Sequence, residues 1–313
     1  MPTDSLPKWR VSQPPGSSPF DLRQRETYLR WREAKLAGYP ADPTALLVEI
    51  RDPSSLTPGE EQAVLSACRK ANMAIYACTG LGLDDPKSVL RRLGSRFGLE
   101  RLDHNLCADE DGIASLRVVE GGRPQEYIPY SNRPIRWHTD GYYNPPGEQI
   151  RGFILHCVRD AASGGANRLL DPEIVYLTMR DEDPDYIRAL TEPRAMTIPA
   201  NLEADTVLRS TQSGPVFSVS PADGSLHMRY TARTRSIQWA GDALTREAVA
   251  FLEQLLNGEL PYVYNYRLAP GQGVICNNVL HSREAFTDDP AGGKTRLFLR
   301  ARYHDRIAQT APP

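Results

Sequence analysis

The sequence predicts an α+β fold in which a two-sheet antiparallel roll is flanked by helices. Short segments of strand-like composition follow one another between residues 114 and 305, and Gly, Pro, Asn and Asp turns separate most of them. Capped amphipathic helices precede this region and interrupt it only twice. Because helices and strands do not alternate one for one, a doubly wound parallel sheet is not expected.

The composition is that of an ordinary globular chain. Its 313 residues are 40% hydrophobic, enough to bury a substantial core in a single domain over residues 1–313. The 37 Lys and Arg nearly balance the 39 Asp and Glu, so neither nucleic acid nor an anionic membrane is an expected partner. The N-terminus lacks the apolar segment of a secretory signal, and the five scattered cysteines include no CxxC pair. These features favour a soluble protein of the cytoplasm.

The first elements of the chain are predicted from its turn residues. Residues 1–24 are rich in Pro, Ser and Gly and are expected to form an N-terminal surface arm. A helix is expected within residues 25–40, ended by Gly38, and a strand over residues 44–50.

Two further helices carry clear start signals. Thr57, Pro58 and Glu60 give the capping-box pattern, in which the Thr side chain and the Glu side chain satisfy each other's backbone donors. Asp85 followed by Pro86 repeats this style of helix start, and an apolar stripe follows each of the two caps.

The second part of the chain is predicted to be rich in strands. The strand-like segments are residues 115–120, 151–158, 215–219, 226–239, 262–268, 272–277 and 295–304. Helical patterns interrupt them at residues 171–179, 183–190 and 245–256.

A first candidate metal pair lies at His138 and Asp140. Residues i and i+2 of an extended strand project to the same side, so both side chains can reach one ion. His and Asp are suitable donors for a borderline divalent metal, and two His with one carboxylate on one face of the ion leave three positions open. Taken alone, however, such a pair is more often a chance pairing in a polar loop.

A second group of candidates lies far along the chain. His281 follows a strand and an Asn-Asn turn, and Arg296 follows it within the last strand-like segment. Alternation places Arg296, Arg300 and Arg302 on one face of that strand. Strand patterning leaves two interpretations open: these arginines face solvent, or they line a polar cavity inside the roll.

Several of these motifs together resemble a known family. Trp-His-Thr-Asp at residues 137–140, Gly164-Gly165, and "NNVLHSREAF" followed by Arg296 are similar to the taurine catabolism dioxygenase (TauD/TfdA) family of Fe(II)/2-oxoglutarate-dependent oxygenases. That family includes gamma-butyrobetaine hydroxylase-like and clavaminate synthase-like enzymes. The resemblance covers residues 125–305, and it implies a double-stranded β-helix (jelly roll) core over approximately residues 114–305, with flanking helices and helical insertions.

The resemblance implies a metal site. His138, Asp140 and His281 match the iron ligands of the family. Three protein ligands leave room for a bidentate 2-oxo acid and for O2, whereas a fourth would block one of them. Because Asp140 is present where related halogenases carry a small residue, hydroxylation is favoured over halogenation.

The resemblance also implies a cosubstrate site. Arg296 matches the arginine that binds the distal carboxylate of 2-oxoglutarate, which a planar guanidinium can meet with two parallel hydrogen bonds. Arg300 matches a position that supports this site or reaches the substrate. The family often has a threonine just after the Gly-Gly pair, and Asn167 is the nearest candidate for that contact here.

Residues for the primary substrate are less well marked. Tyr142 and Tyr143 follow the metal pair, where they either contact substrate or belong to the core. Alternation over residues 226–239 places a polar stripe on one strand face, which would bind an anion or a neighbouring subunit; its members are Arg229, Thr231, Arg233 and Arg235.

The expected function is that of an Fe(II)- and 2-oxoglutarate-dependent dioxygenase. Such an enzyme would couple decarboxylation of 2-oxoglutarate, to succinate and CO2, to hydroxylation of an unactivated C–H bond by O2. The expected substrate is a small polar molecule such as an amino acid or another carboxylate or sulfonate. The alternatives are a zinc-dependent hydrolase or isomerase and a non-catalytic roll that binds metal or anions. Exposed strand edges invite pairing between subunits, so a homo-oligomer is also an expectation.

Overall fold

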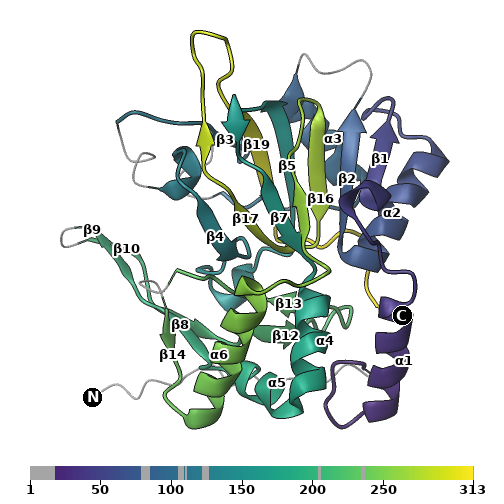
Figure 1. The fold of residues 1–313 in the computed structure, drawn as a ribbon, viewed down its shortest axis with the longest axis vertical. Helices are drawn as coiled ribbons and strands as arrows, with labels where there is room; N and C mark the ends of the chain where they lie inside the picture. Colours follow the sequence, from purple (N-terminus) through teal and green to yellow (C-terminus); the bar gives the residue numbers. More distant parts are fainter. Residues whose placement is uncertain are drawn as a thin grey trace.

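The protein contains a helical part and two facing sheets (Figure 1). The computed structural model describes residues 18–78, 85–104, 109, 111–121, 127–203, 206–233 and 237–312. Most of the expected N-terminal arm, residues 1–17, lies outside the described residues.

The larger sheet has six strands. Their order is β1 (Leu47–Ile50), β2 (Met73–Cys78), β16 (Gln272–Cys276), β5 (Gly152–Arg159), β19 (Leu297–Tyr303) and β3 (Ala114–Leu116). β1 and β2 are parallel, and every other neighbouring pair is antiparallel. Helices α2 (Pro58–Ala71) and α3 (Pro86–Arg96) pack against this sheet, so one of its faces is covered by helices.

The smaller sheet has four antiparallel strands. Their order is β15 (Tyr264–Tyr266), β7 (Asn167–Leu170), β17 (Leu280–Arg283) and β4 (Ile135–His138). Phe153 and Phe298 of the larger sheet share one buried cluster with Leu169 and Tyr264 of the smaller sheet. The two sheets therefore pack face to face, as apolar residues of each inner face form a common core.

A helical layer lies below the smaller sheet in Figure 1. It consists of α1 (Arg25–Leu36), α4 (Pro172–Glu182), α5 (Pro184–Leu190) and α6 (Ala243–Asn257). Short strands accompany these helices: β8 (Met196–Ile198), β9 (Asn201–Glu203), β10 (Thr206–Arg209), β11 (Gln212–Gly214), β12 (Phe217–Val219), β13 (Leu226–Met228) and β14 (Gln238–Trp239). Phe20, near the end of the expected arm, is buried in the core of this layer.

Most predicted helices are confirmed. Thr57 accepts from the Glu60 N–H while the Glu60 carboxylate accepts from the Thr57 N–H, so the predicted capping box is present. The Asp85 side chain caps α3 as predicted. Helix α6 begins two residues before the predicted start, because Asp242 caps it through the Thr245 N–H.

Several predicted strands are shorter than expected, three of them markedly. Residues 43–46 form a 3-10 turn because the Asp42 side chain accepts from the Thr44 N–H. The segment at residues 115–120 is strand only as far as Leu116. The long strand predicted over residues 226–239 is wrong: within its described part the chain forms β13 and β14, with a single bridge from Thr231 to His138 between them.

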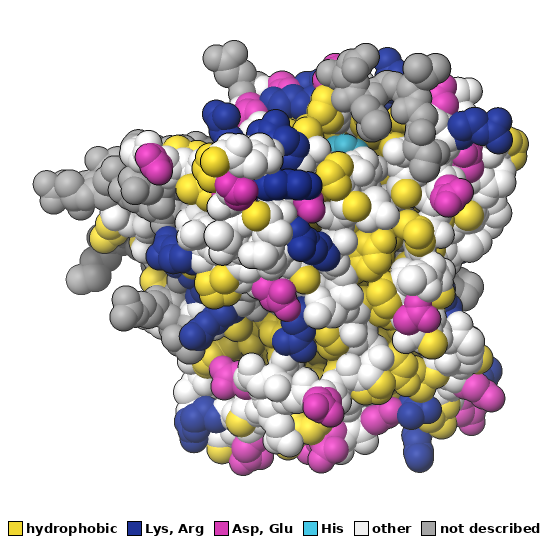
Figure 2. All heavy atoms as spheres, turned by 45° about the horizontal axis from the view of Figure 1, so that its top comes forward, with side chains coloured by type: hydrophobic (Ala, Val, Ile, Leu, Met, Phe, Trp, Pro, Cys, Tyr) yellow, Lys and Arg dark blue, Asp and Glu magenta, His cyan; other side chains and the backbone are white. Residues whose placement is uncertain are grey.

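The surface carries charges of both signs. Figure 2 shows basic and acidic side chains interspersed with hydrophobic ones over the face drawn. None of the helices in the described ranges is long and apolar enough to cross a membrane.

Candidate functional site

Two histidines face each other across the edge of the smaller sheet. His138 ends β4, and its register partner on the antiparallel strand β17 is His281. Their ring centroids lie 4.1 Å apart, with the planes inclined at 50°. Strand pairing thus brings together two imidazoles that are far apart in the sequence.

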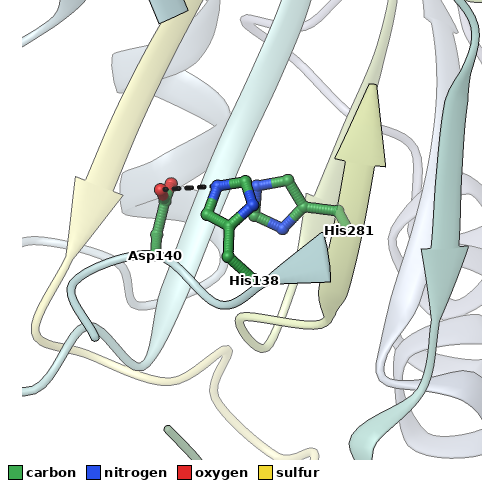
Figure 3. A group of neighbouring side chains, drawn as sticks. All are labelled: His138, Asp140 and His281. Atoms are coloured by element: carbon green, nitrogen blue, oxygen red, sulfur yellow. Dashed lines mark ion pairs between the residues drawn. The ribbon is translucent and has the colours of Figure 1, made fainter. Parts of the chain in front are cut away.

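Asp140 completes a candidate metal site (Figure 3). It lies in the loop just after β4, and its Oδ1 is 3.9 Å from His138 Nε2. One donor atom from each of His138, Asp140 and His281 lies within 4.8 Å of the other two. The ligand set expected from the sequence therefore converges on one point, as a single divalent ion requires.

The two imidazoles are held in matching orientations. His138 Nδ1 lies 3.0 Å from the Arg136 carbonyl oxygen, and His281 Nδ1 lies 3.0 Å from the Val279 carbonyl oxygen. Each Nδ1–H can therefore donate to the backbone two residues earlier, which leaves the Nε2 lone pair for a metal. Burial lowers the pKa of His281, and burial together with repulsion from His281 lowers the pKa of His138 to about 3. Both rings are thus neutral near pH 7, as metal ligation requires.

The environment of Asp140 keeps it ionised. Burial alone would raise its pKa, but the guanidinium groups of Arg300 and then Arg302 hold it well below its usual value. Arg300 Nη1 donates to Asp140 Oδ1 at 3.0 Å, while Oδ2 is buried and has no hydrogen-bond partner among the described residues. A buried carboxylate oxygen without a donor is costly unless a cation satisfies it, so this atom fits a metal ion.

Asn278 holds the backbone at Asp140. Its side-chain oxygen accepts from the Asp140 N–H at 2.8 Å, and its side-chain nitrogen donates to the carbonyls of Asp140 at 3.0 Å and Ile150 at 2.6 Å. Its φ of 51° lies in the left-handed region that Asn tolerates better than most residues. The Asn-Asn turn before His281 was predicted from the sequence, but the contact of Asn278 with Asp140 was not. A turn pattern does not show which distant residue the side chain will contact.

A small cavity lies beside the candidate metal site, between the two sheets. Its walls include Phe153, Leu155, Arg296 and Arg300 from or next to strands of the larger sheet, and Ile135, His138, Asn167, His281 and Arg283 from the smaller sheet. Arg296 and Arg300 therefore line a polar cavity inside the molecule. The alternative, in which this face of the strand meets solvent, is wrong because the strand is buried on both faces.

Arg302 does not line this cavity. Its Nη1 donates to the Tyr143 hydroxyl at 2.8 Å, and its Nη2 pairs with Asp103. Tyr143 thus supports a buried arginine and packs with its ring against Tyr142.

The buried guanidinium of Arg296 forms no ion pair with a carboxylate of the described residues. Arg296 is 4% exposed, its Nη1 has no hydrogen-bond partner among the described residues, and its Cζ lies 3.6 Å from the centroid of Phe298. Burial lowers its pKa to about 10. A Cβ at Gly165 would lie 3.6 Å from Arg296 Nε. The backbone at Gly165 therefore lies close beside the guanidinium. Asn167 also lines the cavity, and its buried Nδ2 is likewise without a partner in the described part of the chain.

Arg283 is a cavity residue that the sequence reasoning missed. It lies two positions after His281 on β17, and it pairs in register with Asn167 of β7. A signal was available, because residues i and i+2 of a strand share one face.

The polar stripe predicted around Arg229 is not a free anion site. The Arg229 guanidinium donates to the carbonyl oxygens of Tyr142 at 2.7 Å, Met196 at 3.0 Å and Gln212 at 2.9 Å. This arginine joins chain segments, and Arg233 alone of the stripe's arginines is exposed among the described residues. Arg235 lies outside the described residues.

Comparison with known proteins identifies relatives of the chain. The model of the family described as "Taurine catabolism dioxygenase TauD, TfdA family" matches residues 78–302. A uridine-5'-phosphate dioxygenase from an Amycolatopsis species is 33% identical over 173 residues, which are 53% of this chain and 60% of the relative. A protein of the same name from a Streptomyces species is 30% identical over 205 residues, 63% of this chain and 71% of the relative. The match with the first relative therefore spans less than two thirds of that relative's length.

Solved structures share the fold. The non-heme iron oxygenase OrfP in complex with Fe and alpha-ketoglutaric acid has a TM-score of 0.58 at 17% identity, covering 79% of this chain and 80% of that one. AAD-2 in complex with Mn(II) and N-oxalylglycine has a TM-score of 0.57 at 15% identity, over 86% and 98% of the two chains. PvcB from Pseudomonas aeruginosa has a TM-score of 0.53 at 18% identity, over 83% and 85%.

Proposed function

The chain belongs to the taurine catabolism dioxygenase TauD, TfdA family, and we propose that it is an iron(II)- and 2-oxoglutarate-dependent dioxygenase. It would hydroxylate an unactivated C–H bond of a small polar molecule. We further propose that the two facing sheets form a double-stranded β-helix over approximately residues 114–305, within a single catalytic domain over residues 1–313. A homo-oligomer and a cytoplasmic location stay predictions of the sequence.

One observation carries the proposal. A cluster of two neutral imidazoles and one ionised carboxylate borders the same small cavity as the unmatched guanidinium of Arg296. The cluster suits a divalent ion of the iron or zinc type, and the guanidinium suits a carboxylate. A 2-oxo acid with a second carboxylate is the ligand that would satisfy both groups at once.

The roles of the residues follow from their contacts. His138, Asp140 and His281 would hold iron(II), which when bound supplies the activation of O2. Arg300 donates to Oδ1 of Asp140 and would hold the carboxylate beside the two imidazoles, while Oδ2 has no other partner in the described part of the chain. Arg296 would bind and orient the distal carboxylate of 2-oxoglutarate, and the Nδ2 of Asn167 is a second donor on the wall of the cavity.

The walls of the cavity would also exclude water from the reacting atoms. Phe153 and Leu155 of β5 form an apolar side, and the Phe153 ring centroid lies 4.9 Å from that of His281. Exclusion of water strengthens the interaction of Arg296 with a carboxylate, because the local dielectric is lower than in solvent.

The charge of the cavity supports an anionic primary substrate. Three guanidinium groups, those of Arg283, Arg296 and Arg300, border the cavity, whereas Asp140 supplies one carboxylate. Because 2-oxoglutarate is a dianion and iron(II) a dication, binding of both leaves this positive excess in place. Two relatives are named uridine-5'-phosphate dioxygenases, and we propose a nucleoside 5'-monophosphate as the substrate. An amino acid or another carboxylate or sulfonate, as expected from the sequence, is the second candidate.

Succinate formation tests this function. The protein loaded with Fe(II) and supplied with 2-oxoglutarate and O2 should form succinate faster when uridine 5'-monophosphate is added. Uridine, which lacks the phosphate, should stimulate much less, and a panel of amino acids tests the second candidate. A protein that binds stoichiometric zinc, does not respond to iron and releases no succinate would contradict the proposal and favour the zinc hydrolase.

A further inference from the structure

The cavity contains more unmatched donors than Arg296 supplies. Asn167 Nδ2, Arg283 Nε, Arg296 Nη1 and Arg300 Nε are buried without hydrogen-bond partners among the described residues, and all four residues line the cavity. They come from β7, from β17, from the residue before β19 and from β19 itself. Four unmatched donors around one space indicate a ligand with several acceptors.

The guanidinium of Arg283 is hydrogen-bonded through Nη2, whereas its Nε is left without a partner among the described residues. Its Nη2 donates to the carbonyl oxygens of Ser131 at 2.7 Å and Arg133 at 2.6 Å. These contacts fix the plane of the guanidinium, yet Nε has no partner in the described part of the chain. An arginine that only joined the chain near Ser131 to β17 would not require a place in the cavity wall.

Arg283 and Arg296 lie beside the same aromatic ring. Their Cζ atoms lie 4.9 Å and 5.2 Å from the centroid of Phe286. Two buried cations this close destabilise each other, and an anion that contacts both would remove the penalty.

We infer that Arg283 is a second arginine of the 2-oxoglutarate site, where it binds the distal carboxylate together with Arg296 and Asn167. The inference rests on the proposed function. Arg283 lies two residues from His281 along β17, and two residues of an extended strand span roughly 7 Å. A five-carbon dicarboxylate that chelates a metal at His281 with its 2-oxo acid end extends far enough to reach this arginine.

Binding to two matched ligands tests the inference without catalysis. The protein is loaded with Mn(II) and titrated calorimetrically with 2-oxoglutarate and with 2-oxopentanoate, which has the same carbon chain but no distal carboxylate. Arg283→Met should weaken binding of 2-oxoglutarate roughly 10- to 100-fold, as expected for a lost charged hydrogen bond. The same substitution should leave the dissociation constants of 2-oxopentanoate and Mn(II) within about a factor of two.

Arg168→Met is the matched control. Arg168 is also a strand arginine that contacts an aromatic ring, 4.9 Å from the centroid of Trp137, but it does not line the cavity. The Arg168→Met variant should bind 2-oxoglutarate and 2-oxopentanoate with unchanged dissociation constants. If Arg283→Met does not fold, Arg283→Lys carries the test, because it keeps the charge and loses the planar group; it too should weaken 2-oxoglutarate selectively.

The outcomes separate the inference from the proposed function. If the wild-type protein binds 2-oxoglutarate and the Arg283 variant binds it equally well, the inference is wrong. Equal weakening of both 2-oxo acids would also overturn it, since a merely structural arginine acts on the whole site. A wild-type protein that binds neither 2-oxo acid would overturn the proposed function, and the inference with it.

Discussion

His138 and His281 are register partners on neighbouring antiparallel strands, and each directs its Nδ1 to the backbone carbonyl two residues before it. This symmetry fixes both rings through the backbone. The two Nε2 atoms therefore face a common point beside Asp140 without reorganisation, which favours rapid and tight metal binding.

Asp140→Asn should abolish tight binding of iron. The amide keeps the shape of the side chain but loses the charge that both a metal and Arg300 require. We expect iron affinity to fall by more than the roughly 10- to 100-fold that loss of an outer-sphere partner causes. Anaerobic Fe(II) titration measures this, with the half-exposed Asp185→Asn, outside the candidate site, as a control. Unchanged iron affinity in Asp140→Asn would show that the metal binds elsewhere.

Asn278→Gly should lower the affinity for iron although it replaces none of the three metal-binding residues. Glycine accepts the φ of 51°, so the substitution removes the amide contacts to Asp140 and Ile150 while avoiding backbone strain. Iron affinity should fall about 10- to 100-fold, as for other outer-sphere residues. Asn257→Gly, at the end of α6, is the control for loss of an asparagine side chain. Wild-type iron affinity in Asn278→Gly would mean that the Asp140 loop is fixed by other contacts.

The convergence of His138, Asp140 and His281 was predicted better than the cavity beside them. Alternation placed His138 and Asp140 on one side, and the resemblance supplied His281, because ligands separated by many residues leave no local signal. Strand patterning could not decide whether Arg296 and Arg300 face solvent or a cavity. Both faces of this strand are largely buried, so a polar face does not indicate the solvent side. The segment around Arg229 was misread for a related reason: its alternating pattern matches a strand, but the Arg229 side chain binds carbonyls of three other segments.

Lys35→Met should destabilise the protein without affecting metal binding directly. Lys35 is buried between Asp171 at 2.7 Å and Glu173 at 2.6 Å, and it joins α1 to the start of α4. Removal of the cation leaves two buried carboxylates side by side, which costs about 3–5 kcal/mol of the free energy of unfolding. Urea denaturation of the metal-free protein measures this loss. The exposed Lys294→Met should change the free energy of unfolding by less than about 0.5 kcal/mol, and an equal effect of the two variants would contradict the account of Lys35.

The metal-free protein should lose stability as the pH falls below about 6.5. Burial lowers the pKa of His156 from its usual 6.5 to about 4. The unfolded chain therefore takes up a proton on this ring at a pH where the folded chain does not, and acid favours unfolding. Between pH 7.5 and pH 4.5 this ring accounts for about 2–3 kcal/mol of lost stability, from about 1.4 kcal/mol per unit of pKa difference.

His156→Gln isolates this contribution. Denaturant unfolding at the two pH values should show a smaller loss in the variant than in the wild type. His156 lies next to Tyr76, whose hydroxyl is 3.0 Å from its Nδ1, so the variant is compared by its pH dependence rather than by its absolute stability. An identical pH dependence in both proteins would show that His156 titrates normally in the folded state.

The decisive measurement is a crystal structure of the protein with Mn(II) and N-oxalylglycine, a 2-oxoglutarate analogue. We expect one metal ion bound by the Nε2 atoms of His138 and His281 and by Asp140. We also expect the oxalyl group on that ion and the other carboxylate against Arg296. A metal bound through other residues, or an analogue whose distal carboxylate lies away from Arg296, would contradict these expectations.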